Sequence, residues 1–333
     1  MKLCYFGTYR QNYSRNQIMM EGLRQAGVEV VECHETLWRG IEDRVQATQG
    51  GWKSPRFWGR VIGAYVRLLR RYARLGDYDV LVVGYPGQFD VFLARFLARL
   101  RGKPVAWDVF MSIYLVALER GLDHSSRFTV SVLRRIERLA LRQPDLLIQD
   151  TAPYVAWLEA THAVPDGRFR LVPTGADDRL FFPQDVPPAD DDIFRVVYYG
   201  SFIPNHGVGI MIEAAHLLAG DPSIQFEMIG QGPEQPGAVQ RAQELGLTNI
   251  TFTEWLEKPE LSRRVAGADL CLGAFGDTPQ SLMTVQNKIY ECLAMRKAVL
   301  TGASPATRAA FNDGVELALC ERNPQSLADA IRA

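Results

Sequence analysis

Several features that identify common protein classes are absent from this chain of 333 residues. No GxGxxG motif occurs, which excludes the usual dinucleotide-binding fingerprint. The cysteines form no CxxC pair and show no other metal-binding spacing, so we expect no bound metal and interpret them as reduced core thiols of a cytosolic protein. The five are Cys4, Cys33, Cys271, Cys292 and Cys320.

Long apolar runs are also missing. The N-terminal segment MKLCYFGTYR is too short an apolar stretch for a signal peptide. No run reaches the length of about 18 residues that a membrane-spanning helix needs. We therefore expect a cytoplasmic protein that does not cross a membrane.

Acidic residues are missing from Lys53 to Gly76. Residues 53–75 place aromatic and aliphatic side chains at helical spacing, with seven basic residues around them. A basic amphipathic helix with Trp and Phe can lie on an anionic bilayer, which would make the protein peripheral on the inner face of the membrane. The alternative is a domain helix packed on a sheet, with arginines that extend to solvent.

The net charge of −1 is distributed unevenly. Residues 1–175 carry 25 Lys and Arg against 17 Asp and Glu, a net of +8, whereas residues 176–333 carry 12 against 21, a net of −9. A basic half followed by an acidic half is typical of two domains with different partners.

Short apolar runs alternate with helical patterns in both halves, which predicts two doubly wound α/β domains in tandem. The segment QDVPPADDD, residues 184–192, has little to bury and is the best candidate for a linker. The predicted domains are therefore residues 1–183 and 193–333.

Three loops of the second domain follow strand ends and are expected to converge on a ligand: Gly200–Gly207, Gly230–Gly232 and Asp277–Thr284. Glycine permits close approach of the backbone to a ligand, and a helix N-terminus after such a loop can bind an anion. His206 could hydrogen-bond a phosphate oxygen there; a capping or surface histidine is the alternative.

The stretch Thr284–Leu300 reads as a helix followed by a buried strand, preceded by a polar loop at residues 276–281. Lys288 and Glu291 lie three residues apart and share a helix face. A cation, a carboxylate and free N–H groups at a helix start suit a phosphate and a polyol. A surface ion pair is the alternative.

Four motifs resemble the glycosyltransferase family 4 pattern, in family order and at family spacing. They are VPTGADDRLFFP (172–183), YYGSFIPNHGVGIMIEAAHLL (198–218), FEMIGQGPE (226–234) and NKIYECLAMRKAVL (287–300). The resemblance implies a GT-B fold, in which two Rossmann-like domains with parallel sheets face a central cleft. It also implies a C-terminal domain that binds a nucleotide-sugar donor without a metal and an N-terminal domain that receives the acceptor.

By the same resemblance, residues of the C-terminal domain take named roles. Gly200, Ser201 and His206 would lie beside the diphosphate, with Lys288 as the permanent positive charge and Glu291 holding the ribose hydroxyls. Gly230, Gly232 and the region of Trp255 would flank the nucleoside, and Thr284 would belong to the donor site.

This chain departs from the family at three places. Phe202, Ile203 and His206 stand in the loop where many relatives carry an Arg and a Lys, and Met283 replaces a common Glu. Asp108 stands where many relatives have a His after the fourth strand. We interpret Asp108 as a sugar or acceptor contact, with a helix N-cap as the alternative.

The first-domain loop Gly7–Arg15 is also expected to face the cleft. Arg10 and Arg15 could contact a phosphate-bearing acceptor or donor; solvent-facing arginines are the alternative.

Together these features predict a retaining glycosyltransferase that moves a sugar from a UDP- or GDP-sugar to a hydroxyl of a glycan, a lipid-linked or a small-molecule acceptor. The alternatives are a degenerate nucleotide-sugar-binding protein and a nucleotide-sugar 2-epimerase. Relatives usually continue with a helix that returns to the first domain, so a chain that stops at Ala333 is expected either to lack that element or to be truncated.

Overall fold

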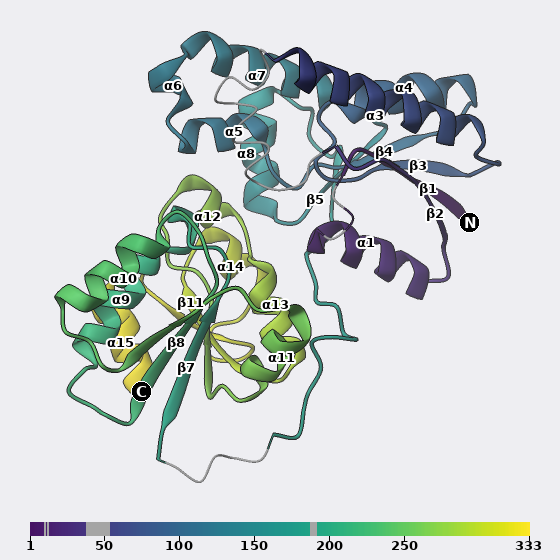
Figure 1. Ribbon diagram of the computed structural model, residues 1–333. Helices are drawn as coiled ribbons and strands as arrows, with labels where there is room; N and C mark the ends of the chain where they lie inside the picture. The colour runs from purple at the N-terminus through teal and green to yellow at the C-terminus, as the bar shows by residue number, and fades with distance from the viewer. Residues whose placement is uncertain (10, 12, 38–53, 187–191) are drawn as a thin grey trace. The chain divides into compact units, whose positions relative to one another are not determined.

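The computed structural model of the protein describes residues 1–9, 11, 13–37, 54–186 and 192–333. The chain divides into two compact units, shown in Figure 1. Residues 1–150 and 154–173 form the N-terminal unit, and residues 151–153 and 174–333 form the C-terminal unit.

The N-terminal unit is built on a six-stranded parallel sheet with the order β2-β1-β3-β4-β5-β6. Its strands are β1 (Lys2–Gly7), β2 (Glu29–His34), β3 (Val80–Val83), β4 (Val105–Asp108), β5 (Leu146–Gln149) and β6 (Phe169–Leu171). The chain leaves β1 toward β2 and later returns to its other side as β3. The loop after β1 therefore lies at the topological switch point, where ligands of such sheets bind.

Helices flank this sheet on both faces, with α3 and α4 on one and α1 on the other (Figure 1). They are α1 (Ser14–Gln25), α3 (Pro55–Ala73), α4 (Asp90–Leu100), α5 (Ile113–Glu119), α6 (Leu122–Ser125), α7 (Arg127–Ala140) and α8 (Ala152–His162). The basic stretch predicted at 53–75 is thus a helix from Pro55 to Ala73, and Lys53 lies outside the described residues.

The C-terminal unit repeats this plan with a six-stranded parallel sheet of order β12-β11-β10-β7-β8-β9. Its strands are β7 (Phe194–Tyr199), β8 (Ile224–Ile229), β9 (Ile250–Thr253), β10 (Leu270–Leu272), β11 (Ala298–Gly302) and β12 (Ala318–Cys320). The switch point here lies between β7 and β10, so the loop after β7 occupies the position expected of a ligand site.

Helices of the C-terminal unit follow most strands. They are the 3-10 turn η2 (Pro204–His206) and the helices α9 (Val208–Leu217), α10 (Gln235–Glu244), α11 (Lys258–Ala266), α12 (Pro279–Met283), α13 (Asn287–Ala294), α14 (Pro305–Ala310) and α15 (Pro324–Arg332). Two apolar clusters form the core. One includes Val196, Met211 and Leu327, and the other includes Val197, Ile289 and Val299. Residues 196 and 197 are neighbours on β7, so their side chains point to opposite faces and the sheet is buried on both sides.

The structure corrects two sequence expectations. The C-terminal unit begins at Thr174, ahead of the boundary expected after residue 183, because Phe181 packs in its core with Val197. Of the expected linker 184–192, residues 187–191 lie outside the described residues, and Gln184 hydrogen-bonds to Ser262 within the C-terminal unit. The polar loop expected at 276–281 is partly helical, because Thr278 caps α12 through its side chain.

Candidate functional site

The loop after β7 brings the backbone of Gly200 next to the side chain of Lys288. Gly200 has φ 142°, and a Cβ atom at this position would lie 3.0 Å from Lys288 Nζ. The positive φ favours glycine here, and the absence of a side chain leaves room for the ammonium group. Gly200 lies in the loop after β7 and Lys288 lies on α13. The structure therefore brings these two predicted site residues together at the switch point.

Lys288 is buried, with 5% of its surface exposed, and its Nζ has no hydrogen-bond partner among the described residues. Nζ lies 3.9 Å from the centroid of the Tyr198 ring, a cation–π distance. Burial lowers the pKa of Lys288 from 10.5 to about 7, with Cys292 and Glu291 acting in the opposite direction. The charge is therefore not permanent in the ligand-free protein, contrary to the sequence expectation.

His206 ends η2 and lies against the same tyrosine. Its Nδ1 is 2.8 Å from Tyr198 Oη and also contacts the carbonyl oxygen of Ser201, to which Nδ1 must donate. Burial, followed by the charge of Lys288, lowers the pKa of His206 well below 6.5. In the neutral ring Nε2 then carries no proton, so a hydrogen bond to phosphate would require protonation. The capping alternative does not hold, because Gly207 is the N-cap of α9. The half-buried ring is also held by Tyr198 and Ser201 and is therefore not a free surface histidine.

Glu291 is also buried, and its Oε2 accepts a hydrogen bond of 2.8 Å from the Tyr199 hydroxyl. Burial raises the pKa of Glu291, while the hydrogen bond from Tyr199 lowers it. No ion pair joins Glu291 to Lys288, both of which are described residues. The alternative of a surface ion pair is therefore wrong, and the helix offers a carboxylate and an ammonium group as separate functional groups.

The other predicted donor-site residues differ in their surroundings. A Cβ on Gly230 would lie 2.0 Å from the Gly200 carbonyl oxygen, and Gly232 is packed in the same way on Phe202, so both are explained by backbone packing. Thr284 Oγ1 donates to the Gln280 carbonyl oxygen. Trp255, which follows β9, is 58% exposed.

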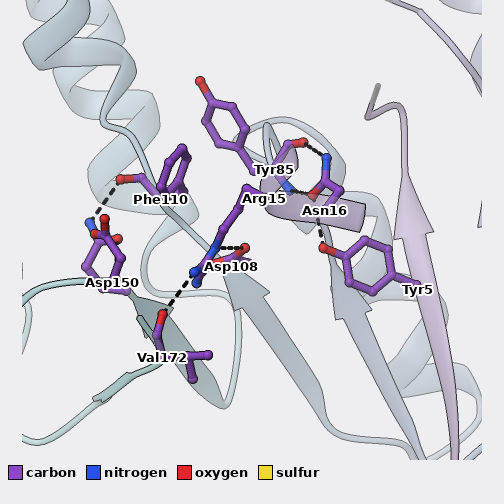
Figure 2. Close-up of polar contacts among 9 residues, drawn as sticks. Tyr5, Arg15, Asn16, Tyr85, Asp108, Phe110, Asp150 and Val172 are labelled. Carbon is purple, nitrogen blue, oxygen red and sulfur yellow. Dashed lines mark hydrogen bonds and ion pairs between the residues drawn. The ribbon is translucent and has the colours of Figure 1, made fainter. Parts of the chain in front are cut away.

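In the N-terminal unit, Arg15 and Asp108 form a buried ion pair (Figure 2). Arg15 Nε lies 2.8 Å from Asp108 Oδ2, and Nη2 lies 2.9 Å from Oδ1. Nη1 donates to the Val172 carbonyl oxygen. Burial opposes the charge of Arg15, but Asp108 outweighs it and raises the pKa of Arg15.

This pair corrects the sequence predictions for both residues. Arg15 is 2% exposed and Asp108 is 0% exposed, so neither side chain is free to contact an acceptor, and Arg15 is not a solvent-facing arginine either. The N-cap alternative for Asp108 is also wrong, because Ser112 caps α5. Arg10 lies outside the described residues.

The loop after Gly7 is held by a residue that the sequence did not indicate. Asp90, at the start of α4, accepts hydrogen bonds from the Thr8 backbone N–H (2.7 Å) and hydroxyl, and one from Tyr65 of α3 (2.7 Å). Burial raises the pKa of Asp90, and these donors act against it. The switch-point loop of this sheet is thereby fixed to two helices.

Two family models match almost the whole chain. The model described as "Glycosyl transferase 4-like domain" matches residues 12–175, and the model described as "Glycosyl transferases group 1" matches residues 193–333. The chain belongs to the group 1, family 4-like glycosyltransferases. A comparison with curated protein sequences gives no match.

Solved structures of GT-B glycosyltransferases resemble the enzyme in fold over its full length. HepE of Anabaena, crystallised in complex with UDP, has 14% identity and a TM-score of 0.70, with 100% of this chain and 89% of that chain covered. Sucrose-phosphate synthase of Thermosynechococcus elongatus has 16% identity and a TM-score of 0.68, with 99% and 88% covered. The predicted GT-B fold and glycosyltransferase class are thus confirmed.

The glycosyltransferase has an arginine among the loops that follow its C-terminal strands, which sequence analysis missed. Arg322, which follows β12, donates to the carbonyl oxygens of Gly276, Gly302 (3.1 Å) and Ala303 (2.8 Å), and to Ser281 Oγ (3.1 Å). One guanidinium thus joins the loops after β10, β11 and β12. Arg322 follows the end of β12 by two residues, which places it at the carboxyl edge of the sheet.

Two features are absent from the described residues of the glycosyltransferase: a membrane-spanning helix and a cluster of metal-binding side chains. None of the helices within them is both long and apolar enough to cross a bilayer. Within the same residues there is no group of three or more His, Cys, Asp or Glu side chains that could hold a metal ion.

Proposed function

We propose that the enzyme transfers a sugar from a UDP- or GDP-sugar to an acceptor hydroxyl, with retention of anomeric configuration. The observation that carries the proposal is the buried ammonium group of Lys288, without a hydrogen-bond partner among the described residues and beside the backbone of Gly200. A site that buries a cation without a hydrogen-bonded or ion-paired partner is suited to an anionic ligand. HepE, a structural neighbour, was crystallised with UDP and with UDP-glucose, which favours UDP.

In this proposal the diphosphate lies between Lys288 and the N-terminus of α9, where backbone N–H groups and the helix dipole attract negative charge. Glu291 accepts hydrogen bonds from the ribose hydroxyls. Its Oε2 is already held by Tyr199, so the orientation of the carboxylate is set before the ligand arrives. Trp255 and the loop at Gly230–Gly232 adjoin the nucleoside.

In the proposed reaction, negative charge develops on the departing diphosphate, next to Lys288. The bond between the anomeric carbon and the diphosphate oxygen breaks as the acceptor oxygen bonds to that carbon, and the acceptor proton passes to the departing diphosphate. Lys288 stabilises the negative charge that develops on the diphosphate, an effect worth roughly 10²–10³ in rate for a single group of this kind. The absence of a metal requirement stays a prediction, and turnover after chelation tests it.

The test is a transfer assay with UDP- and GDP-sugars, in which the released nucleotide and the anomeric configuration of the product are measured. Lys288→Ala should lose most of its turnover while it stays folded. Lys297→Ala, which changes a lysine three residues after the end of α13, should keep it. Unchanged turnover in Lys288→Ala would refute the assigned role.

A degenerate nucleotide-sugar-binding protein is the second candidate. The observation in its favour is at Phe202, in the loop that carries two cations in many relatives. Its side chain is apolar and fully buried in the core, so this position offers no charged group to a ligand. Donor binding without transfer or hydrolysis would support it. A 2-epimerase would convert the nucleotide sugar without any acceptor, so product analysis in the absence of an acceptor distinguishes it.

Among the acceptor classes, the basic helix favours a lipid-linked one. Contact of residues 53–75 with a membrane would bring the N-terminal unit to lipid substrates at the cytoplasmic face. A comparison of acceptors presented in vesicles and in detergent-free solution tests this choice.

A further inference from the structure

Helix α3 exposes an apolar stripe that is separate from the face it buries. The buried face consists of Ala64, Leu68 and Tyr72. Four large apolar side chains are nevertheless exposed: Trp58 (50%), Ile62 (61%), Val66 (39%) and Leu69 (39%). At about 100° per residue these four fall within an arc of roughly 80°, next to the buried face. Packing on the sheet therefore accounts for only one of the two apolar sectors of this helix.

Four arginines in the second half of α3 and at its C-cap fall into two groups around the helix. Arg67 and Arg71 both bind Glu35, at 2.9 Å and 2.7 Å, and lie on the side of β2. Arg70 and Arg74 lie between those two and the apolar stripe, are exposed, and form no ion pair with a described residue. The exposed apolar stripe is thus bordered by cations whose charge is not neutralised within the described part of the chain.

Helix α4 continues this surface. It runs alongside α3, because Tyr65 hydrogen-bonds to Asp90 and Tyr72 hydrogen-bonds to the Leu97 carbonyl oxygen (3.2 Å). Its outer face exposes Phe96 (60%) and Leu100 (70%), one helical turn apart. Both helices cover the same face of the sheet (Figure 1). Single exposed apolar side chains are ordinary, but six large ones on two neighbouring helices indicate an interaction site.

We propose that this surface, formed by the exposed side chains of α3 and α4 named above, docks on an anionic lipid bilayer. Apolar side chains with a border of Arg are what an interfacial helix presents, since the apolar atoms enter the acyl boundary and the guanidinium groups meet lipid phosphates. Charge complementarity favours a bilayer over a second copy of the chain as the partner of this surface. A second copy would place its own arginines against these arginines, whereas anionic headgroups would neutralise them. Docking requires no sugar donor, so this inference stands apart from the transfer reaction.

The test is co-sedimentation of the full-length protein with vesicles of phosphatidylcholine alone and of phosphatidylcholine mixed with phosphatidylglycerol. We expect binding to the mixed vesicles, weakened by added salt because the Debye length shortens. Trp58 should enter the bilayer, so the protein should show a blue shift of its fluorescence that Trp58→Phe lacks.

Matched pairs of variants distinguish the contribution of this surface to vesicle binding from the contribution of the protein's net charge. Ile62→Asp should weaken binding roughly tenfold or more, because it removes an apolar side chain from the acyl boundary. Val315→Asp, which adds the same charge at an exposed site of the C-terminal unit, should bind like the wild type. Arg70→Gln should weaken binding about fivefold, whereas Arg263→Gln should not.

Three results would overturn the proposal. The first is equal binding to both kinds of vesicle, and the second is equal loss in Ile62→Asp and Val315→Asp. The third is a dimer in sedimentation velocity that Ile62→Asp dissociates, because the stripe would then be covered by a second copy. Each can occur whether or not the enzyme transfers sugar, so failure here leaves the proposed transfer reaction untouched and removes only the argument for a lipid-linked acceptor.

Discussion

Lys288 Nζ lies 3.9 Å from the centre of the Tyr198 ring and hydrogen-bonds to none of the described residues. A desolvated cation–π contact of this kind contributes about 2 kcal/mol, less than removal of an ammonium group from water costs. The protein therefore carries a destabilising group at the switch point of its C-terminal sheet. A function that needs a buried cation explains why it is tolerated.

Lys288→Met should stabilise the fold and abolish turnover. Replacing an uncompensated buried charge by an apolar side chain of similar length should raise the free energy of unfolding by about 1–4 kcal/mol near neutral pH. The measurement is denaturant unfolding together with a transfer assay. Lys297→Met should change stability by less than about 0.5 kcal/mol. A less stable Lys288→Met variant would mean that the ammonium group has an internal partner.

The stability difference between Lys288→Met and the wild type should depend on pH. The pKa of Lys288 is about 7 in the folded protein and near 10.5 when unfolded, so the unfolded state binds more protons between these values. Wild-type stability therefore gains from this lysine as pH rises from about 7 to about 10. The advantage of the Met variant should be largest below pH 7 and shrink above it. A constant difference across this range would contradict the lowered pKa.

UDP binding should take up a proton through the same lysine. A bound diphosphate favours the ammonium form and raises its pKa, so above about pH 7 each binding event protonates Lys288 and the affinity falls by up to about tenfold per pH unit. Calorimetry in buffers of different ionisation enthalpy measures the protons taken up. Lys288→Met should bind weakly and take up none. Uptake that persists in this variant would assign the proton to another group, such as His206.

The alternation of strands and helices could be predicted because each parallel strand is a short apolar run buried on both faces. Helix α12 was missed because Thr278 and Pro279 serve both turns and helix starts, and only the structure shows that Thr278 caps a helix. The spacing of Lys288 and Glu291 correctly gave a shared helix. That spacing could not reveal that both would be buried, since burial depends on Tyr198 and Tyr199 of a distant strand.

In the N-terminal unit, individual side chains have partners that the sequence did not predict. Arg15 follows a polar loop and was expected to face a ligand, yet it reaches Asp108, 93 positions away in the chain. Which of many carboxylates a buried arginine pairs with depends on the packing of α1 against the sheet. Asp90 and Arg322 were missed for the same reason, because their partners are backbone groups of other loops.

Asp108→Asn should be more damaging than removal of the whole ion pair. Loss of one partner leaves Arg15 charged and buried, at a cost of about 3–5 kcal/mol. The double variant Arg15→Met with Asp108→Leu removes both charges and should recover much of that stability. Thermal unfolding of Arg15→Met, Asp108→Leu and the double variant gives the coupling energy. Additive effects would mean that the two side chains do not interact as a pair.

Arg322→Lys should weaken UDP binding while leaving most of the fold intact. Lysine keeps the charge but lacks the planar set of donors that reaches three loops at once, so the loop at Gly276 and the start of α12 would lose their fixed positions. Ser281, which Arg322 contacts, also donates to Asn205 of η2, so the disturbance should extend to His206. We expect a rise in the donor KM of about tenfold and a loss of about 1–3 kcal/mol in stability. Arg308→Lys, at an exposed arginine 3.8 Å from Glu321, is the matched control and should change neither. A donor KM equal to that of the wild type, with stability lowered, would reduce Arg322 to a structural residue.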